Sequence, residues 1–189
     1  MKKLMLVVIL IIAVVWVLPL FAQQTPEPVG IITDHIATPR GAFITGSIPR
    51  ADLERILYAG VRAPSARNAQ PWHFTVIQNL ELMRRMVSDT VEGNVIIVVS
   101  AAGDSRTNHA EILDCALAVQ SINLAALQLG YGARIYTAPI NNINQNLLGE
   151  LRLPAGHSAV AVVRVGRVNV DAISAPSARQ SFNSKVTFR

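Results

Sequence analysis

An apolar helix that needs cover on every side is the strongest constraint on how this chain can fold. The segment from Ile112 to Leu129 carries apolar residues on nearly all of its faces, and Gly130 follows as its stop signal. Such a helix belongs in a deep core or against a second subunit. The run NVIIVVSAAG before it (residues 94–103) is continuous and rich in β-branched residues, as in a central strand buried on both faces.

Helix-like and strand-like stretches alternate along the rest of the chain. Apolar spacing predicts a helix over 47–63, with Gly60 as its breaker, and a half-buried strand over 73–77. Further helices are expected over 80–90 and 143–154, and further strands over 133–139, 158–168 and, last, 185–188. This order predicts a layered α/β (α+β) domain in which helices flank a mixed sheet.

The N-terminus has the layout of a bacterial export signal. Lys2 and Lys3 precede an uncharged run from Leu4 to Ala22, and the polar stretch QQTPEP follows at once. The run is also nearly as long as the roughly 20 residues that span a bilayer. The alternative to cleavage after Ala22 is therefore an uncleaved membrane anchor. Residues 1–22 are thus a signal peptide or anchor, 23–39 a linker and 40–189 the domain, which either reading places in the periplasm or outside the cell.

Charge and motif content argue against several function classes. The formal net charge of +5 falls to +3 without the two leader lysines, which is too mild and scattered to indicate nucleic-acid binding. His35, His73, His109 and His157 are far apart in the sequence, so no metal site is expected. Cys115 is the only cysteine and lies inside the apolar helix pattern, where a small buried hydrophobe is expected.

The stretch AGVRAPSARNAQPWHF, residues 59–74, contains more amide, proline and aromatic residues than a simple connecting loop requires. It follows a helix and places Ser65 close to Asn68, a surface able to hydrogen-bond a flat heterocycle. A local turn stabilised by the Ser and Asn side chains, with Trp72 packed as a core plug, explains the same residues. The residues alone leave both readings open.

Three blocks resemble the nitroreductase family. ILYAGVRAPSARNAQPWHFTVI resembles the family's flavin loop, APSxxNxQPWxF between a helix and a strand. LDCALAVQSINLAALQLGYGARIYTAPI is similar to its long dimer helix with an LGxG turn, and LRLPAGHSAVAVVRVGRV is similar to its penultimate strand. The blocks span 47–170 in the family's order. The resemblance implies a nitroreductase-like fold with a long central dimer helix, in which the C-terminal tail of one subunit embraces its partner.

The same resemblance implies a function. Members are homodimers that bind FMN between the subunits and pass hydride from NADH or NADPH through flavin N5 to nitroaromatics, quinones or similar small acceptors. The flavin performs that chemistry, so no catalytic side chain is expected. The alternative is a flavin- or ligand-binding module that keeps the fold without turnover.

Cofactor-binding positions follow from the resemblance residue by residue. The loop residues would contact the isoalloxazine and ribityl groups, with one side chain as a brace. The stretch after the dimer helix would offer backbone N–H groups toward N5, and arginines would meet the phosphate. These expected residues are Pro64, Ser65, Asn68 and Gln70 (the brace) in the loop, Thr137 and Ala138 after the helix, and Arg40 and Arg179 for the phosphate.

One family motif is altered. Members usually begin with Arg-Ser-x-Arg-x-aromatic, whose polar residues hold the phosphate and ribityl of FMN. With Phe43 as the aromatic, Thr38 and Pro39 stand at the first two positions and Gly41 at the second arginine. Arg40 survives one residue out of register. The missing positive charge is expected to weaken FMN binding or lower the flavin potential.

Overall fold

The computed structural model describes residues 37–103, 109–173 and 178–189. All of them lie in one compact unit that runs from Asp34 to Arg189. The predicted signal or anchor over 1–22 lies outside the described residues, as does nearly all of the predicted linker.

Four strands form one sheet in the order β1-β2-β4-β3. They are β1 (His73–Ile77), β2 (Val95–Ala102), β3 (Gly132–Tyr136) and β4 (His157–Gly166). Every neighbouring pair is antiparallel, so the predicted mixed sheet is wrong. The helix between β2 and β3 does connect two strands of the same direction, but β4 inserts between them. Alternation of helix and strand in the sequence does not reveal such an insertion.

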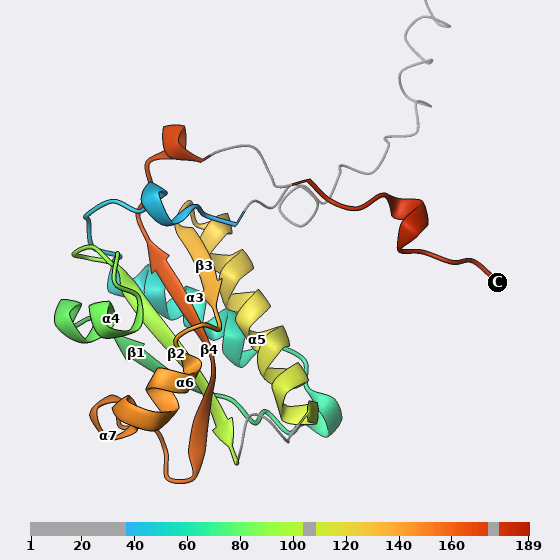
Figure 1. Cartoon of the computed structure of the whole chain (residues 1–189), viewed down its shortest axis with the longest axis horizontal. Helices are drawn as coiled ribbons and strands as arrows, with labels where there is room; N and C mark the ends of the chain where they lie inside the picture. The colour runs from blue at the N-terminus through green and yellow to red at the C-terminus, as the bar shows by residue number, and fades with distance from the viewer. Residues whose placement is uncertain (1–36, 104–108, 174–177) are drawn as a thin grey trace, which may run out of the picture. The chain divides into compact units, whose positions relative to one another are not determined.

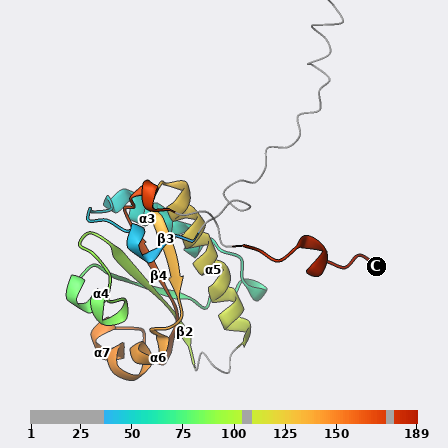
Figure 2. The same ribbon diagram turned by 45° about the horizontal axis from the view of Figure 1, so that its top comes forward.

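Helices cover both faces of the sheet (Figure 1). One face carries α3 (Arg50–Val61) and α5 (His109–Gln128), and the other carries α4 (Leu80–Met86), α6 (Ile140–Asn142) and α7 (Leu148–Leu151). A π-helical turn, η4 (Ile143–Leu147), joins α6 to α7. The predicted helices and the first four strands are confirmed within a few residues, and Figure 2 shows the two helical layers from a second side.

The central strand β2 divides the core in two. Val95, Ile97 and Val99 pack with α3 and α5, whereas Ile96 and Val98 pack with α4 and the α6–α7 region. Successive side chains of a strand point to opposite faces, so a strand without polar positions needs cover on both. The prediction of a central strand buried on both faces is confirmed.

Gly60 does not break its helix as predicted. It lies inside α3 and is buried. A Cβ atom at this position would lie 2.7 Å from the Ile122 side chain of α5. The glycine therefore permits close packing of α3 on α5, and α3 ends only after Val61.

The predicted strand over 185–188 is wrong for the single chain. These residues follow a short 3₁₀ turn, η6 (Phe182–Ser184), and are exposed, with Phe188 84% exposed. A strand needs a neighbour to take its backbone hydrogen bonds, and residues 185–188 pair with no described strand of their own chain.

One face of α5 is left exposed by the described residues. Cys115, Ile122 and Ala126 point into the core, whereas Leu113 and Leu117 are 66% and 46% exposed. Among the described residues, α5 alone is long and apolar enough to cross a bilayer, a test that core helices of soluble proteins also pass. The described residues thus cover only part of the apolar surface of α5.

Candidate functional site

The loop between α3 and β1 has an unusual backbone. Arg67, Asn68 and Gln70 have φ angles of 53°, 57° and 47°. Non-glycine residues rarely take this left-handed region, and among the described residues only Arg152 shares it. Strained backbone of this kind persists where surrounding contacts impose it, and it gathers at functional sites.

Three hydrogen bonds that involve side chains help to hold the loop in that shape. The Ser65 Oγ accepts from the Gln70 N–H at 3.0 Å, and the Gln70 Nε2 donates to the Asn68 carbonyl at 3.3 Å. The Ala66 N–H donates to the Asp114 carboxylate on α5 at 3.0 Å. Gln70 thus braces the loop, while the exposed Asn68 side chain has no hydrogen-bond partner among the described residues.

Trp72 lies at the exit of the loop, partly buried. It packs against the core under α3 and α5 and stacks on Phe74 with ring centroids 6.5 Å apart. Pro64 is exposed at the loop's start. Trp72 therefore anchors one end of the loop to the core, while most of the loop is exposed to solvent, as expected of a loop that contacts a ligand.

A second group of predicted residues lies at the β3 edge of the sheet. Thr137 and Ala138 are exposed directly after β3 and turn the chain into α6. The Arg40 guanidinium lies 5.9 Å from the ring of Tyr136, the last residue of β3. The structure therefore brings Arg40 to the segment that was expected to face the flavin. Arg179 lies in the exposed tail.

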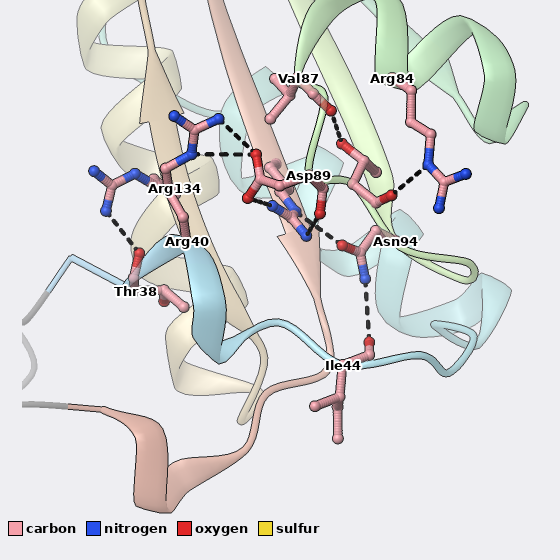
Figure 3. Close-up of polar contacts among 10 residues, drawn as sticks. Thr38, Arg40, Ile44, Arg84, Val87, Asp89, Asn94 and Arg134 are labelled. Atoms are coloured by element: carbon pink, nitrogen blue, oxygen red, sulfur yellow. Dashed lines mark hydrogen bonds and ion pairs between the residues drawn. The ribbon is translucent and has the colours of Figure 1, made fainter.

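Residues 38–44 contact Asp89 and Asn94 (Figure 3), which in turn bind a buried arginine of the sheet for which the sequence predicted no role. Arg164 of β4 is 0% exposed, and its guanidinium lies 4.0 Å from the ring of Phe43. It donates to the Asn94 side chain at 2.8 Å, and to the carboxylate and carbonyl of Asp89 at 2.9 and 3.0 Å. Asn94 in turn donates to the Ile44 carbonyl at 3.3 Å.

Asp89 joins this network to Arg40. Its carboxylate accepts two hydrogen bonds from the Arg40 guanidinium, at 2.6 and 3.1 Å. Burial alone would raise the pKa of the Asp89 carboxyl, but the hydrogen bonds from Arg40 and Arg164 outweigh it and hold the pKa below its usual value. Asp89 therefore stays ionised at neutral pH, and Arg40 is engaged within the chain.

The two groups of predicted residues do not meet within one chain. The Ser65–Gln70 loop leads into β1 and bonds to α5, whereas Arg40 and Thr137 lie at β3, the opposite edge. Three strand spacings separate these edges by roughly 14 Å. The loop also belongs to the α3–α5 layer, while Arg164, paired with Ile96 in register, faces the other layer.

One signal for the buried network was present in the sequence. Arg164 lies between valines in a stretch whose pattern predicts a buried strand. A charged group buried there needs a carboxylate or another hydrogen-bond acceptor as its partner. The partners, Asp89 and Asn94, lie in a loop 70 or more residues earlier and carry no local pattern. Pairing over that separation could not be read from spacing.

Neither thiol nor metal chemistry has local support. Burial, followed by the nearby Glu111 and Asp114 carboxylates, raises the pKa of the Cys115 thiol to about 12, so it is not a nucleophile at neutral pH. The prediction of a small buried hydrophobe is confirmed, since Cys115 is 0% exposed. Among the described residues, no three His, Cys, Asp or Glu side chains gather as a metal site would require.

Comparison with known sequences gives a partial match. Residues 38–102 match the profile of the "Nitroreductase family". A protein of Archaeoglobus fulgidus named "Putative NADH dehydrogenase/NAD(P)H nitroreductase" is 37% identical over 90 residues, 43% of this chain. A protein of the same name from Methanothermobacter thermautotrophicus is 31% identical over 93 residues. The chain spans about half the length of these relatives, 52% and 49%.

Comparison with solved structures covers most of the chain. A nitroreductase with bound FMN from Desulfitobacterium hafniense has a TM-score of 0.70 at 21% identity, over 85% of this chain and 96% of its own. A "putative nitroreductase in complex with fmn" from Desulfovibrio desulfuricans has a TM-score of 0.69 at 26% identity, over 84% and 94%. Residues 38–102 are thus similar to the nitroreductase family in sequence, and the chain shares the fold of these FMN-bound nitroreductases.

Proposed function

We propose that this chain is an exported, FMN-dependent oxidoreductase that works as a homodimer. It would take hydride from NADH, NADPH or another donor and reduce a nitroaromatic, a quinone or a similar small acceptor. The observation that carries the proposal is the strained, braced loop with its exposed Asn68 amide, in a segment that matches the family. The relatives' names and the FMN bound in structures of the same fold support it. Export is supported by the sequence of residues 1–22 alone.

The available donors fit the parts of FMN. A flat ring with amide-like edges suits the Asn68 amide and the backbone of the loop, which the Ser65–Gln70 hydrogen bond holds in place. A phosphate group suits guanidinium side chains, because the planar fork of arginine can hold two of its oxygens. When bound, FMN would supply the hydride-transfer chemistry, and the protein would position it and exclude competing reactions.

A second copy of the chain would complete the site. One chain holds its loop and its β3-edge residues at opposite edges of the sheet, so a two-fold pair can bring one subunit's loop to the other's β3 edge. The uncovered stripe of α5, with Leu113 and Leu117, supports burial of this helix against its symmetry mate. Such an interface would supply the cover that α5 lacks.

The C-terminal tail has a candidate place in such a dimer. On its outer side β1 pairs with no other described strand. A groove of about 570 Å³ runs there between α3 and α7, lined by β1 itself, Leu53, Leu57 and Leu151. An extended segment can add to an open sheet edge through backbone hydrogen bonds. Residues 185–188 of the partner, which form no strand in their own chain, would add there.

We expect the purified full-length chain to carry a yellow flavin whose visible absorption bleaches with NADH or NADPH. Replacing Asn68 with alanine should weaken FMN retention by about 1.4 kcal/mol, roughly tenfold, because an amide contact to the ring is lost. Binding is measured by the change in flavin fluorescence. Gln145, another exposed amide, serves as the control, and Gln145→Ala should bind FMN normally. A colourless protein that refuses added FMN would overturn the proposed function.

A non-catalytic flavin-binding role is the second candidate. It is favoured by the altered motif at Thr38–Phe43 and by the engagement of Arg40 with Asp89. In that case the flavin bleaches with dithionite but with neither nicotinamide. The same spectrum therefore separates the two candidates.

Replacing Leu113 and Leu117 together with glutamate should separate the dimer into monomers. Two charges in an apolar interface cost more than the contacts they replace, because each carboxylate is desolvated without a partner. Sedimentation equilibrium measures the mass, which should halve relative to the wild type. Leu148→Glu on α7 changes a similarly apolar exposed residue away from α5 and should leave the mass unchanged. A wild-type chain that is already monomeric would contradict the homodimer.

A further inference from the structure

Arg134 of β3 carries a guanidinium that no carboxylate engages within the described part of the chain. Its Nη1 donates to the Thr38 carbonyl at 2.9 Å, and its Cζ lies 5.7 Å from the Tyr136 ring. Arg40 lies 5.9 Å from the same ring. We propose that Arg134 binds the FMN phosphate beside Arg40, in place of the arginine missing from the N-terminal motif. This inference rests on the proposed function.

Thr38 stands where the first arginine of the motif is expected, and its side chain is turned inward. It is 1% exposed, and its Oγ1 accepts from the Ala133 N–H at 3.0 Å. The hydroxyl is therefore held by the strand and does not face solvent. Arg134, the next residue along β3, reaches back to the Thr38 carbonyl. Strand β3 thus places a guanidinium beside Thr38, where the motif lacks its first arginine.

The charges around this position favour an anion. Arg134 and Arg164 are directly opposite each other on β3 and β4, and like charges in that relation destabilise a sheet. Asp89 compensates Arg164 and Arg40, and both of its carboxylate oxygens are used in doing so. The three arginines and one aspartate leave a local excess of positive charge. A phosphate group beside Arg134 would balance it.

The other two arginines are less suited to the role. Arg164 is fully buried, and each of its three nitrogens already donates a hydrogen bond. Arg40 is held by two hydrogen bonds from its guanidinium to Asp89. Arg134 makes one hydrogen bond to the described residues, so most of its donors remain for a ligand. Figure 3 shows Arg40 and Arg134 at the same end of the network.

A comparison of FMN with riboflavin tests the proposal, because riboflavin is the same flavin without the phosphate. Binding of each to the full-length chain is measured by fluorescence, for the wild type, Arg134→Gln and Arg134→Lys. We expect the wild type to prefer FMN and Arg134→Gln to lose roughly 10- to 100-fold in FMN affinity, with riboflavin affinity unchanged. Arg134→Lys should recover part of the loss, because the charge is kept without the planar fork.

Arg55→Gln is the matched control. Arg55 is an exposed arginine on α3, 67% exposed, and its removal changes the net charge equally. It should leave both affinities unchanged. If Arg134→Gln binds FMN as the wild type does, or loses FMN and riboflavin equally, the proposal is overturned while the proposed function stands. A wild type that binds neither flavin removes the proposed function and this inference with it.

Discussion

Replacing Asp89 with alanine is expected to lower the free energy of unfolding by about 3 kcal/mol. Among the described residues, Asp89 supplies the only carboxylate paired with Arg164, a guanidinium that is 0% exposed. Burial of a charged group costs desolvation free energy, and without the partner no attraction offsets that cost. The value lies at the low end of the usual range because the Asp89 side chain is 34% exposed, so water can replace part of what is lost. Urea unfolding at pH 7 measures the difference.

The pH dependence of the same variant tests the cause. The pKa of Asp89 is lowered in the folded state, so its stabilisation is fully present above the ordinary aspartate pKa of about 3.9 and is lost as the pH falls through the folded value. The gap between wild type and Asp89→Ala should therefore narrow below about pH 4. Glu54→Ala removes the exposed partner of Arg50 and should change stability by less than about 0.5 kcal/mol. A gap that stays constant down to acid pH would contradict the electrostatic origin.

Replacing Gly93 with alanine is expected to cost about 3 kcal/mol or more, from backbone strain and a steric clash together. Gly93 has a φ of +82°, which L residues rarely adopt. A Cβ atom there would also lie 2.5 Å from the Gly46 carbonyl oxygen and 2.7 Å from the Ser47 nitrogen. Both are backbone atoms, so the 43–47 segment would have to move away from the loop that holds Asp89 and Asn94.

A Gly103→Ala variant distinguishes the cost of backbone strain from the cost of the steric clash. Gly103 has the same φ of +82°, but an added Cβ would meet nothing within 4 Å. Gly103→Ala should therefore carry only the backbone cost, about 1 kcal/mol. The difference between the two variants in thermal or urea unfolding isolates the close approach at Gly93. Equal losses would mean that the clash is relieved without cost.

The local elements of this fold were readable because their signals are local. The spacing of apolar residues predicted α3, whereas long apolar runs predicted α5 and β2. The burial of β2 on both faces followed from its lack of polar positions. The loop signature at 64–72 likewise predicted where unusual chemistry would lie, and the structure adds its strained backbone at Arg67, Asn68 and Gln70. Its cofactor contacts remain predictions.

Pairing between distant segments was not readable in the same way. Alternating helices and strands favoured a mixed sheet, but β4 enters between β2 and β3 and makes every neighbour antiparallel. The strand predicted at 185–188 has the right residues, but no described strand of its own chain pairs with it. Its β propensity cannot say whether an edge is available, because that edge belongs to another part of the fold or to another subunit.

The sequence by itself determined the layered fold, the buried central strand, the apolar helix that needs more cover than one chain provides, and the altered Arg-Ser-x-Arg motif. Only the tertiary structure decided that Arg164 is buried against Asp89 and Asn94, that Asp89 also engages Arg40, and that Arg134 lies beside Thr38. Periodicity records which side of an element is apolar. Which charge meets which depends on strand order and register, and these are settled only when the whole chain packs.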